Sequence, residues 1–90
     1  MHHAFRSLPP EAVGALEEEA RRVDAELREI VRRGRLAGSE LAYKLAHVER
    51  RGLHRALGFA AVSTYAVTKG YTDSPGKARD LIKLVHDLER

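Results

Sequence analysis

The stretch EAVGALEEEARRVDAELREIVRR, residues 11–33, decides the fold of this chain. Its apolar residues recur at alternating intervals of three and four, the spacing of one face of an α-helix. We call these residues the seam; they are Val13, Leu16, Ala20, Val23, Leu27 and Ile30. Pro10 suits an early helical position, whose N–H has no partner within a helix, and Gly34 can end the helix. The sequence therefore predicts one long amphipathic helix over residues 11–33.

Two interpretations of the seam are open. The helix can pack on the rest of its own domain, or it can form a coiled coil with a second copy, because heptad spacing is typical of both. A chain of 90 residues with two phenylalanines and no tryptophan has a modest core, so packing against a second copy would help it. We predict a homodimer whose interface is the seam.

The remainder of the chain also has helical patterns. A second helix is expected to begin near Ser39, a good N-cap residue, and to stop at Gly58, with a kink allowed at Gly52 because glycine weakens a helix interior by ~1 kcal/mol. A short third helix is expected over residues 61–69. Its β-branched residues leave a strand as the alternative.

The last helix is expected to begin sharply after Ser74, with Pro75 at its first position. The predicted fold is an all-α small domain of four helices, with a long N-terminal helix and a C-terminal helix-turn-helix-like unit. Along the chain this gives a flexible N-terminus over 1–10, the long helix over 11–33 and a helical domain over 39–90.

Positive charge is concentrated in the second part of the chain. Residues 1–33 hold six basic and seven acidic side chains, whereas residues 34–90 hold ten basic and six acidic ones. In a helix-turn-helix, the second helix places its N-terminal residues against base edges in the major groove. The short third helix, the turn KGYTDS and the capped last helix have these proportions. The pattern therefore indicates a DNA-binding surface.

A resemblance to a known family supports this interpretation. The segments LAYKLAHVERRGLHRALGFAAVSTYAV and SPGKARDLIKLVHDLE resemble the helical region that precedes the nuclease domain in bacterial HNH-endonuclease-family proteins. The matching residues are Leu45, Ala46, Val48, Glu49, Arg50, Arg51, Leu53, Gly58, Phe59, Ser63, Tyr65, Ser74, Ala78, Leu81 and Ile82. An HNH centre uses histidines and an asparagine around a metal, and this chain has no asparagine. The resemblance therefore implies an accessory or targeting module without the nuclease domain.

We predict a dimeric accessory or regulatory protein that binds double-stranded DNA. Phosphates would be contacted by Arg50, Arg51, Arg55 and Lys69. Base edges would be approached by Lys77, Arg79 and Lys83, on a helix capped by Ser74. Without asparagine or glutamine the usual bidentate contact to adenine is missing, so G·C preference or weak specificity is expected. The alternative is a protein–protein interaction or self-assembly module built on the first helix, with a larger protein as its partner.

Other functions are not indicated by the sequence. The absence of cysteine excludes disulfides and thiolate metal sites. His47 and His54 are seven residues apart, a spacing that is unusual for a metal-binding pair on a helix, and no catalytic pairing is evident. We therefore expect no enzyme activity, metal or cofactor. Without a long apolar run, we expect no membrane association and a cytoplasmic location, with the nucleoid as its site if the protein binds DNA.

Overall fold

All secondary structure in the described part of the chain is helical. The computed structural model describes residues 10–34 and 38–89. Its helices are α1 (Pro10–Arg32), α2 (Gly38–Arg51), α3 (Leu53–Ala56), α4 (Val62–Thr68) and α5 (Pro75–Leu88). The predicted all-α class is confirmed, and the segment for which a strand is the alternative forms α4.

The number of helices differs from the prediction, because the second predicted helix is two helices. Gly52 separates α2 from α3 with φ 69° and ψ 26°, in the left-handed region. A side chain there would bring its Cβ close to the following carbonyl oxygen at a cost of about 1–2 kcal/mol, which glycine avoids. The chain leaves the axis of α2 at this point, and the single helix expected to run to Gly58 becomes α2 followed by the short α3.

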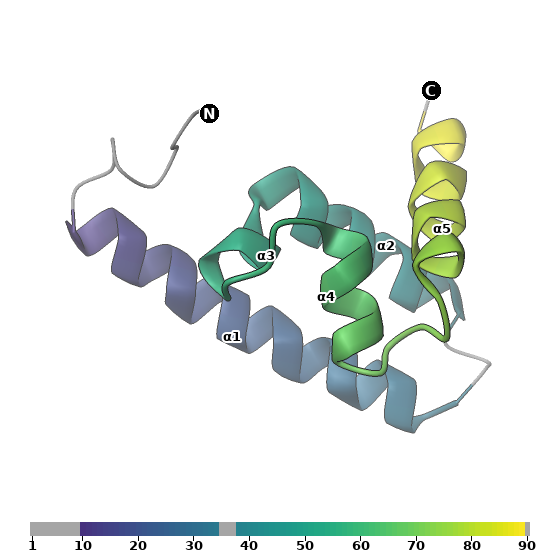
Figure 1. Ribbon diagram of the computed structural model, residues 1–90, viewed down its shortest axis with the longest axis horizontal. Coiled ribbons are helices and arrows are strands. Elements are labelled where there is room, and N and C mark those ends of the chain that lie inside the picture. The colour runs from purple at the N-terminus through teal and green to yellow at the C-terminus, as the bar shows by residue number, and fades with distance from the viewer. Residues whose placement is uncertain (1–9, 35–37, 90) are drawn as a thin grey trace.

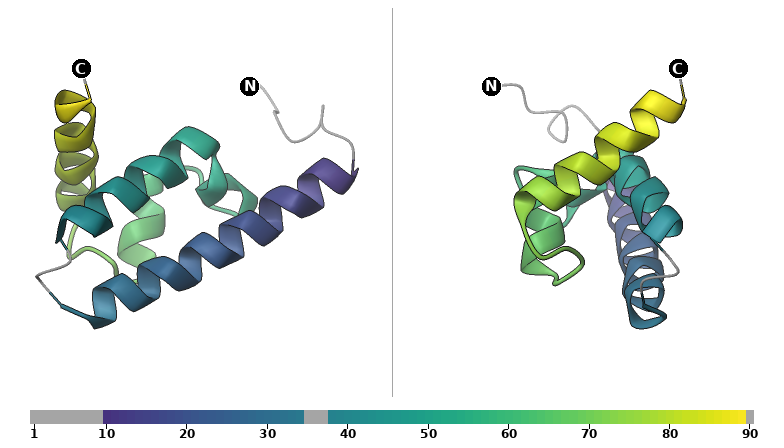
Figure 2. Two further views of the ribbon diagram at one scale, coloured as in Figure 1. Left: turned by 180° about the vertical axis from the view of Figure 1, so that it is seen from behind. Right: turned by 90° about the vertical axis from the view of Figure 1, so that its right-hand side faces the viewer.

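Helix α2 is the centre of the molecule. It packs against α1, α3, α4 and α5. Figure 1 shows α1 as the long helix along one side, with α4 in front and α5 standing at the opposite end from the start of α1. The two views in Figure 2 show that α5 crosses α2 rather than running alongside α1. Because α2 is covered on several sides, Leu45 and Ala46 in its middle are completely buried.

The seam of α1 is the side of that helix that faces the core. Ala20, Val23, Leu27 and Ile30 are buried, with Leu27 0% exposed, and Val13 and Leu16 are partly buried. The chain's own helices cover these residues, as the first interpretation of the seam expects. Dimerisation remains a prediction, and the buried part of the seam is not open to a second copy in this structure.

The segments predicted as separate parts share one core. Leu27 of α1, Leu53 of α3 and Tyr65 of α4 belong to the same cluster of buried side chains. Of the predicted flexible segment 1–10, residues 1–9 lie outside the described residues, and Pro10 begins α1. In residues 10–34 and 38–89, none of the helices has the combination of length and apolar character that a membrane crossing requires.

Candidate nucleic-acid interface

Four arginines surround one groove on the surface. Arg50 and Arg51 end α2, Arg55 lies in α3, and Arg79 comes from α5. The groove has a volume of about 470 Å³, and residues 60–63 at the start of α4 also line it. We call this surface the arginine groove. The structure thus brings residues 50–55 and the last helix to one place, although more than twenty positions separate them in the sequence.

Local structure explains how these arginines meet. Gly52 ends α2 directly after Arg51, and the turn places Arg55 in the next short helix. The start of α5 is fixed by Ser74, whose Oγ accepts a hydrogen bond from the Lys77 N–H at 3.2 Å. This confirms the predicted cap. With that start, Ala78 faces the core and Arg79 comes to the edge of the groove.

Two of the four arginines are already paired with carboxylates. Arg51 bonds Glu19 of α1 through Nε at 3.0 Å and Nη2 at 2.7 Å, a two-pronged contact. Arg50 donates from Nη1 to both carboxylate oxygens of Glu89, at 3.0 and 3.2 Å. The hydrogen bond from Arg51 holds the pKa of Glu19 below its ordinary value, so Glu19 is charged at neutral pH. These pairs link the end of α2 to α1 and to the end of α5.

The other two arginines have no such partner within the described residues. Neither Arg55 nor Arg79 takes part in an ion pair there, and both are exposed. Glu49 also lines the groove, with its Oε1 3.6 Å from Nε2 of His86. Because Glu89 and Glu19 neutralise Arg50 and Arg51, Arg55 and Arg79 together with Glu49 leave the groove with a small net positive charge.

A buried histidine lies next to these charges. His54 lines the arginine groove but is only 4% exposed, and its Nδ1 has no hydrogen-bond partner in the described structure. Burial lowers the pKa of His54, and the positive charge of Arg55 acts in the same direction. His54 is therefore neutral at physiological pH and adds no charge to the groove. Among the described residues, no group of three or more side chains is arranged to hold a metal ion.

The remaining predicted DNA-contacting residues lie elsewhere. Lys69 points to Asp24 of α1, with its Nζ 3.4 Å from the carboxylate. Lys77 borders a separate hollow beside Val31, Leu41 and other apolar residues. Lys83 lies 3.5 Å from Asp87 on the same helix. The structure therefore gathers four of the eight predicted residues in one groove and separates these three lysines from it, while Ser74 serves as the helix cap.

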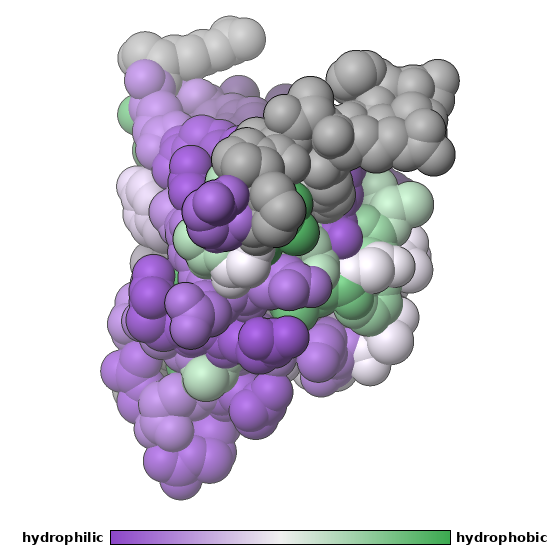
Figure 3. Space-filling view, turned by 90° about the vertical axis from the view of Figure 1, so that its left-hand side faces the viewer, coloured by the Kyte–Doolittle hydropathy of each residue, from purple (hydrophilic) through white to green (hydrophobic). Residues whose placement is uncertain are grey.

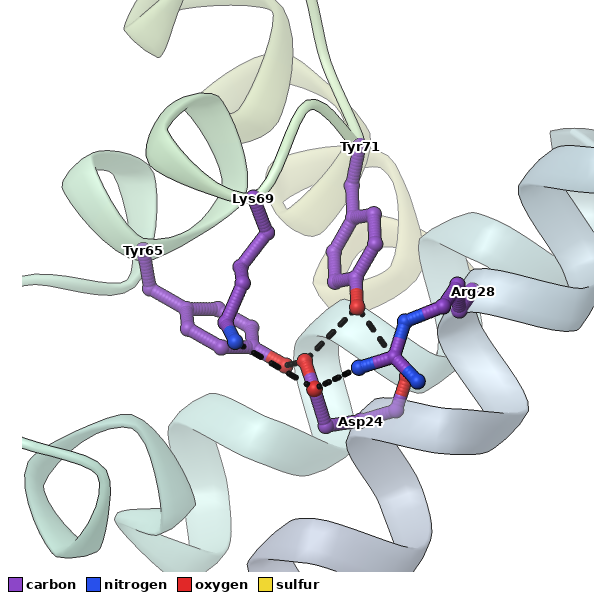
Figure 4. A network of polar contacts seen from close by, with 5 residues as sticks. All are labelled: Asp24, Arg28, Tyr65, Lys69 and Tyr71. Carbon is purple, nitrogen blue, oxygen red and sulfur yellow. Dashed lines mark hydrogen bonds and ion pairs between the residues drawn. The ribbon is translucent and has the colours of Figure 1, made fainter.

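A polar cluster that the sequence did not predict ties α1 to the segment around α4 (Figure 4). Asp24 is 5% exposed, and its Oδ1 accepts hydrogen bonds from the hydroxyls of Tyr65 at 2.6 Å and Tyr71 at 2.7 Å. Arg28 and Lys69 contribute positive charge at 2.8 and 3.4 Å from Oδ2. Burial alone would raise the pKa of Asp24. The two hydroxyl donors and the two cations outweigh that effect, so the pKa is lowered.

One sequence signal for this cluster exists but is weak. Asp24 follows seam residue Val23 and lies four positions after Ala20, so it falls at the border of the core-facing stripe. An acidic residue at such a border does not by itself show whether it is buried or which residues it contacts. Tyr65 and Tyr71 are 41 and 47 positions away from Asp24.

The outer surface of α1 is hydrophilic, as expected if the apolar seam faces the core. Figure 3 views the molecule from the left-hand side of Figure 1, and purple, hydrophilic residues cover its lower left, where α1 lies. Paler and green residues gather at the right-hand edge, on the side of α4.

No family model, curated protein or solved structure matches this chain. A function can therefore be inferred only from the residues of this chain and their arrangement.

Proposed function

We propose that this chain binds double-stranded DNA by seating the phosphate backbone in the arginine groove. The observation that supports this best is the convergence of Arg50, Arg51, Arg55 and Arg79 from three helices on one groove. A guanidinium group is planar and carries donors that match two phosphate oxygens at once. Several such groups along one groove fit the repeating charge of a nucleic-acid backbone better than they fit a neutral partner.

The role of α5 in this proposal is to anchor rather than to read bases. Residues 69–74 and α5 follow α4 in the order of a helix-turn-helix, and the start of α5 is exposed. That connection is longer than the three or four residues typical of the motif. Lys77 and Arg79 lie on different sides of α5, so they would not enter one groove together. Binding with little dependence on base sequence follows, in keeping with a chain that lacks asparagine and glutamine.

One chain carries the whole arginine groove, so the proposed binding does not require a second copy. The alternative, an interaction module built on the first helix, depends on an exposed seam. The buried seam residues of α1 weaken that alternative, since Val23 and Leu27 pack inside the chain's own core. A larger protein partner would have to contact another face.

The experiment is a salt titration of binding to a labelled mixed-sequence duplex, followed by fluorescence anisotropy. The wild-type chain should bind at low salt, and its affinity should fall steeply as salt rises. Changing Arg55 and Arg79 together to alanine should weaken binding. It should also lower the salt slope by about one unit for each phosphate that the variant no longer binds.

The matched control changes Arg21 and Arg22 to alanine. Both side chains are exposed on α1, and their removal alters the net charge by the same amount. This control should retain nearly all of the affinity. Equal reductions of affinity in the two double variants would show a diffuse charge effect without a docked groove, and no binding by the wild type at low salt would reject the proposal.

A further inference from the structure

We propose that Glu19 and Glu89 bind Arg51 and Arg50 in the free protein at the positions that DNA phosphates would take. Arg55 and Arg79 then make the first contact with the DNA backbone, and the two glutamates limit the affinity of the protein for DNA. This inference rests on the proposed DNA binding. It adds a division of labour within the arginine groove, and it assigns two acidic residues a role in setting the strength of binding.

The contact between Arg51 and Glu19 has the geometry by which arginine holds a phosphate. Nε and Nη2 of Arg51 face Oε2 and Oε1 of Glu19 at 3.0 and 2.7 Å. A phosphate would present two oxygens to the same edge of the guanidinium group. A phosphate and Glu19 therefore compete for one set of donors. The Glu19 side chain is 18% exposed, so its contact with Arg51 is partly shielded from water.

The contact between Arg50 and Glu89 is looser. Both carboxylate oxygens of Glu89 share the single Nη1 of Arg50, at 3.0 and 3.2 Å. The side chains are 51% and 43% exposed, so water and salt weaken their attraction. Glu89 also follows the last turn of α5, where the helix dipole disfavours a negative charge. A phosphate should displace Glu89 more easily than Glu19.

Arg55 and Arg79 differ from Arg50 and Arg51 because neither forms an ion pair with a described carboxylate. They line the same groove from α3 and α5 and remain available to the first phosphate. Once DNA is held there, its neighbouring phosphates lie within the same groove and can replace Glu89 and Glu19 as the partners of Arg50 and Arg51. Removing either competing carboxylate should therefore tighten binding without adding any new contact.

The test compares Glu19→Gln and Glu89→Gln with the wild type in the anisotropy titration on the same duplex. Glutamine keeps the shape of glutamate but not its charge. Because surface ion pairs contribute little and both arginine partners are 51% exposed, each variant should remain folded, with a Tm near that of the wild type. Each should lower the Kd by about twofold to fivefold, the range that corresponds to the strength of one exposed pair.

The control is Glu29→Gln, which removes the same charge from α1. Glu29 pairs with the exposed Arg32 at 2.7 Å, and Arg32, unlike Arg50 and Arg51, does not line the arginine groove. It should change the Kd less than either of the other two variants. A gain equal to that of Glu89→Gln would show that net charge alone is responsible and would overturn the inference.

The possible results separate the inference from the proposed function. Tighter binding by Glu19→Gln and Glu89→Gln, beyond the control, supports both. Binding by the wild type with no gain in these variants overturns the inference and leaves the proposed function standing. If Glu19→Gln fails to fold, Glu89→Gln still decides, since its pair is exposed. If neither the wild type nor any variant binds at low salt, both proposals fall.

Discussion

Tyr65 donates a hydrogen bond of 2.6 Å to the carboxylate of Asp24, which lies 41 residues earlier in the chain. The bond joins α4 to α1 through two buried side chains. Tyr71 adds a second hydroxyl, whose one proton lies between the same carboxylate oxygen at 2.7 Å and the Asp24 main-chain carbonyl at 3.0 Å. The rings of the two tyrosines meet edge to face, with their centroids 5.8 Å apart. A single buried carboxylate thus organises aromatic packing at the junction of α1 and α4.

Removing the Tyr65 hydroxyl should destabilise the fold. Tyr65→Phe deletes a hydrogen bond to a charged, buried acceptor, and such bonds contribute about 1.5–3 kcal/mol each. The measurement is the free energy of unfolding from urea titration. The control is Tyr43→Phe, which removes the same atom from a side chain that is 47% exposed and should stay within about 0.5 kcal/mol of the wild type. Equal destabilisation at both positions would contradict the role given to Asp24.

Stability should depend on pH through the same cluster. The folded state lowers the pKa of Asp24 below its ordinary value of 3.8, so the stabilisation is present above that value and is lost as the pH falls through the lower folded pKa. Burial and the neighbouring Asp24 charge raise the pKa of Tyr65 and Tyr71 above their ordinary 10.0. Their contribution is therefore present below pH 10.0 and is lost as the pH rises further.

This pH dependence can be checked by urea unfolding in acid and alkaline buffers. The double variant Tyr65→Phe, Tyr71→Phe should lose stability less steeply with pH than the wild type at both ends. If the free energy of unfolding of the double variant falls with decreasing pH as steeply as that of the wild type, Asp24 does not determine the acid sensitivity of the fold.

Replacing Leu27 tests whether the seam of α1 is an internal core or a surface between copies. Leu27→Ala should cost about 2–5 kcal/mol, because it leaves a cavity at a site that is 0% exposed. Leu27→Lys should unfold the chain, since a buried unpaired charge is far more costly. Leu84→Lys on α5, where the side chain is 52% exposed, is the control and should leave the fold intact. Circular dichroism measures whether each variant is folded, and light scattering measures its mass. If the wild type is a dimer and Leu27→Lys is a folded monomer, the coiled-coil interpretation is favoured.

Two glycines should respond in opposite directions to the same substitution. Gly52→Ala should cost about 1–2 kcal/mol, because φ at this position is +69° and an alanine there is strained even though no atom lies within 4 Å. Gly14→Ala, inside α1 and also without neighbours within 4 Å, should stabilise by about 0.4–1 kcal/mol by reducing the freedom of the unfolded chain. Thermal unfolding of the two variants measures the difference, and a stabilised Gly52→Ala would contradict the observed break between α2 and α3.

The sequence predicts those features that depend on neighbouring residues. The period of the seam and the Ser74–Pro75 cap place α1 and α5 within a residue or two of their observed bounds. Gly52 is visible as a weak point, but whether a glycine bends a helix or ends it depends on what packs around it. The meeting of Arg79 with Arg50 depends on how α5 crosses α2, which no local pattern specifies.

The separation of Lys77 from Arg79 could have been expected from the sequence. Grouping Lys77 with Arg79 by charge overlooks that residues two positions apart on a helix point in different directions. The structure places them at separate hollows, as that spacing requires. Asp24 is different, because only the folded arrangement brings Tyr65 and Tyr71 to it.

The distance along the chain between Asp24 and its two donors also bears on the order of folding. Bonds across 41 and 47 residues close long loops, and the entropy lost on loop closure must be met before such bonds can form. The pairing of α4 with α5 and of α2 with α3 involves nearer segments and has no such delay. We therefore expect the Asp24 cluster to be absent from the transition state. Tyr65→Phe should then speed unfolding and leave the folding rate nearly unchanged. The cluster would form after the transition state of folding, and its loss would come before the transition state of unfolding.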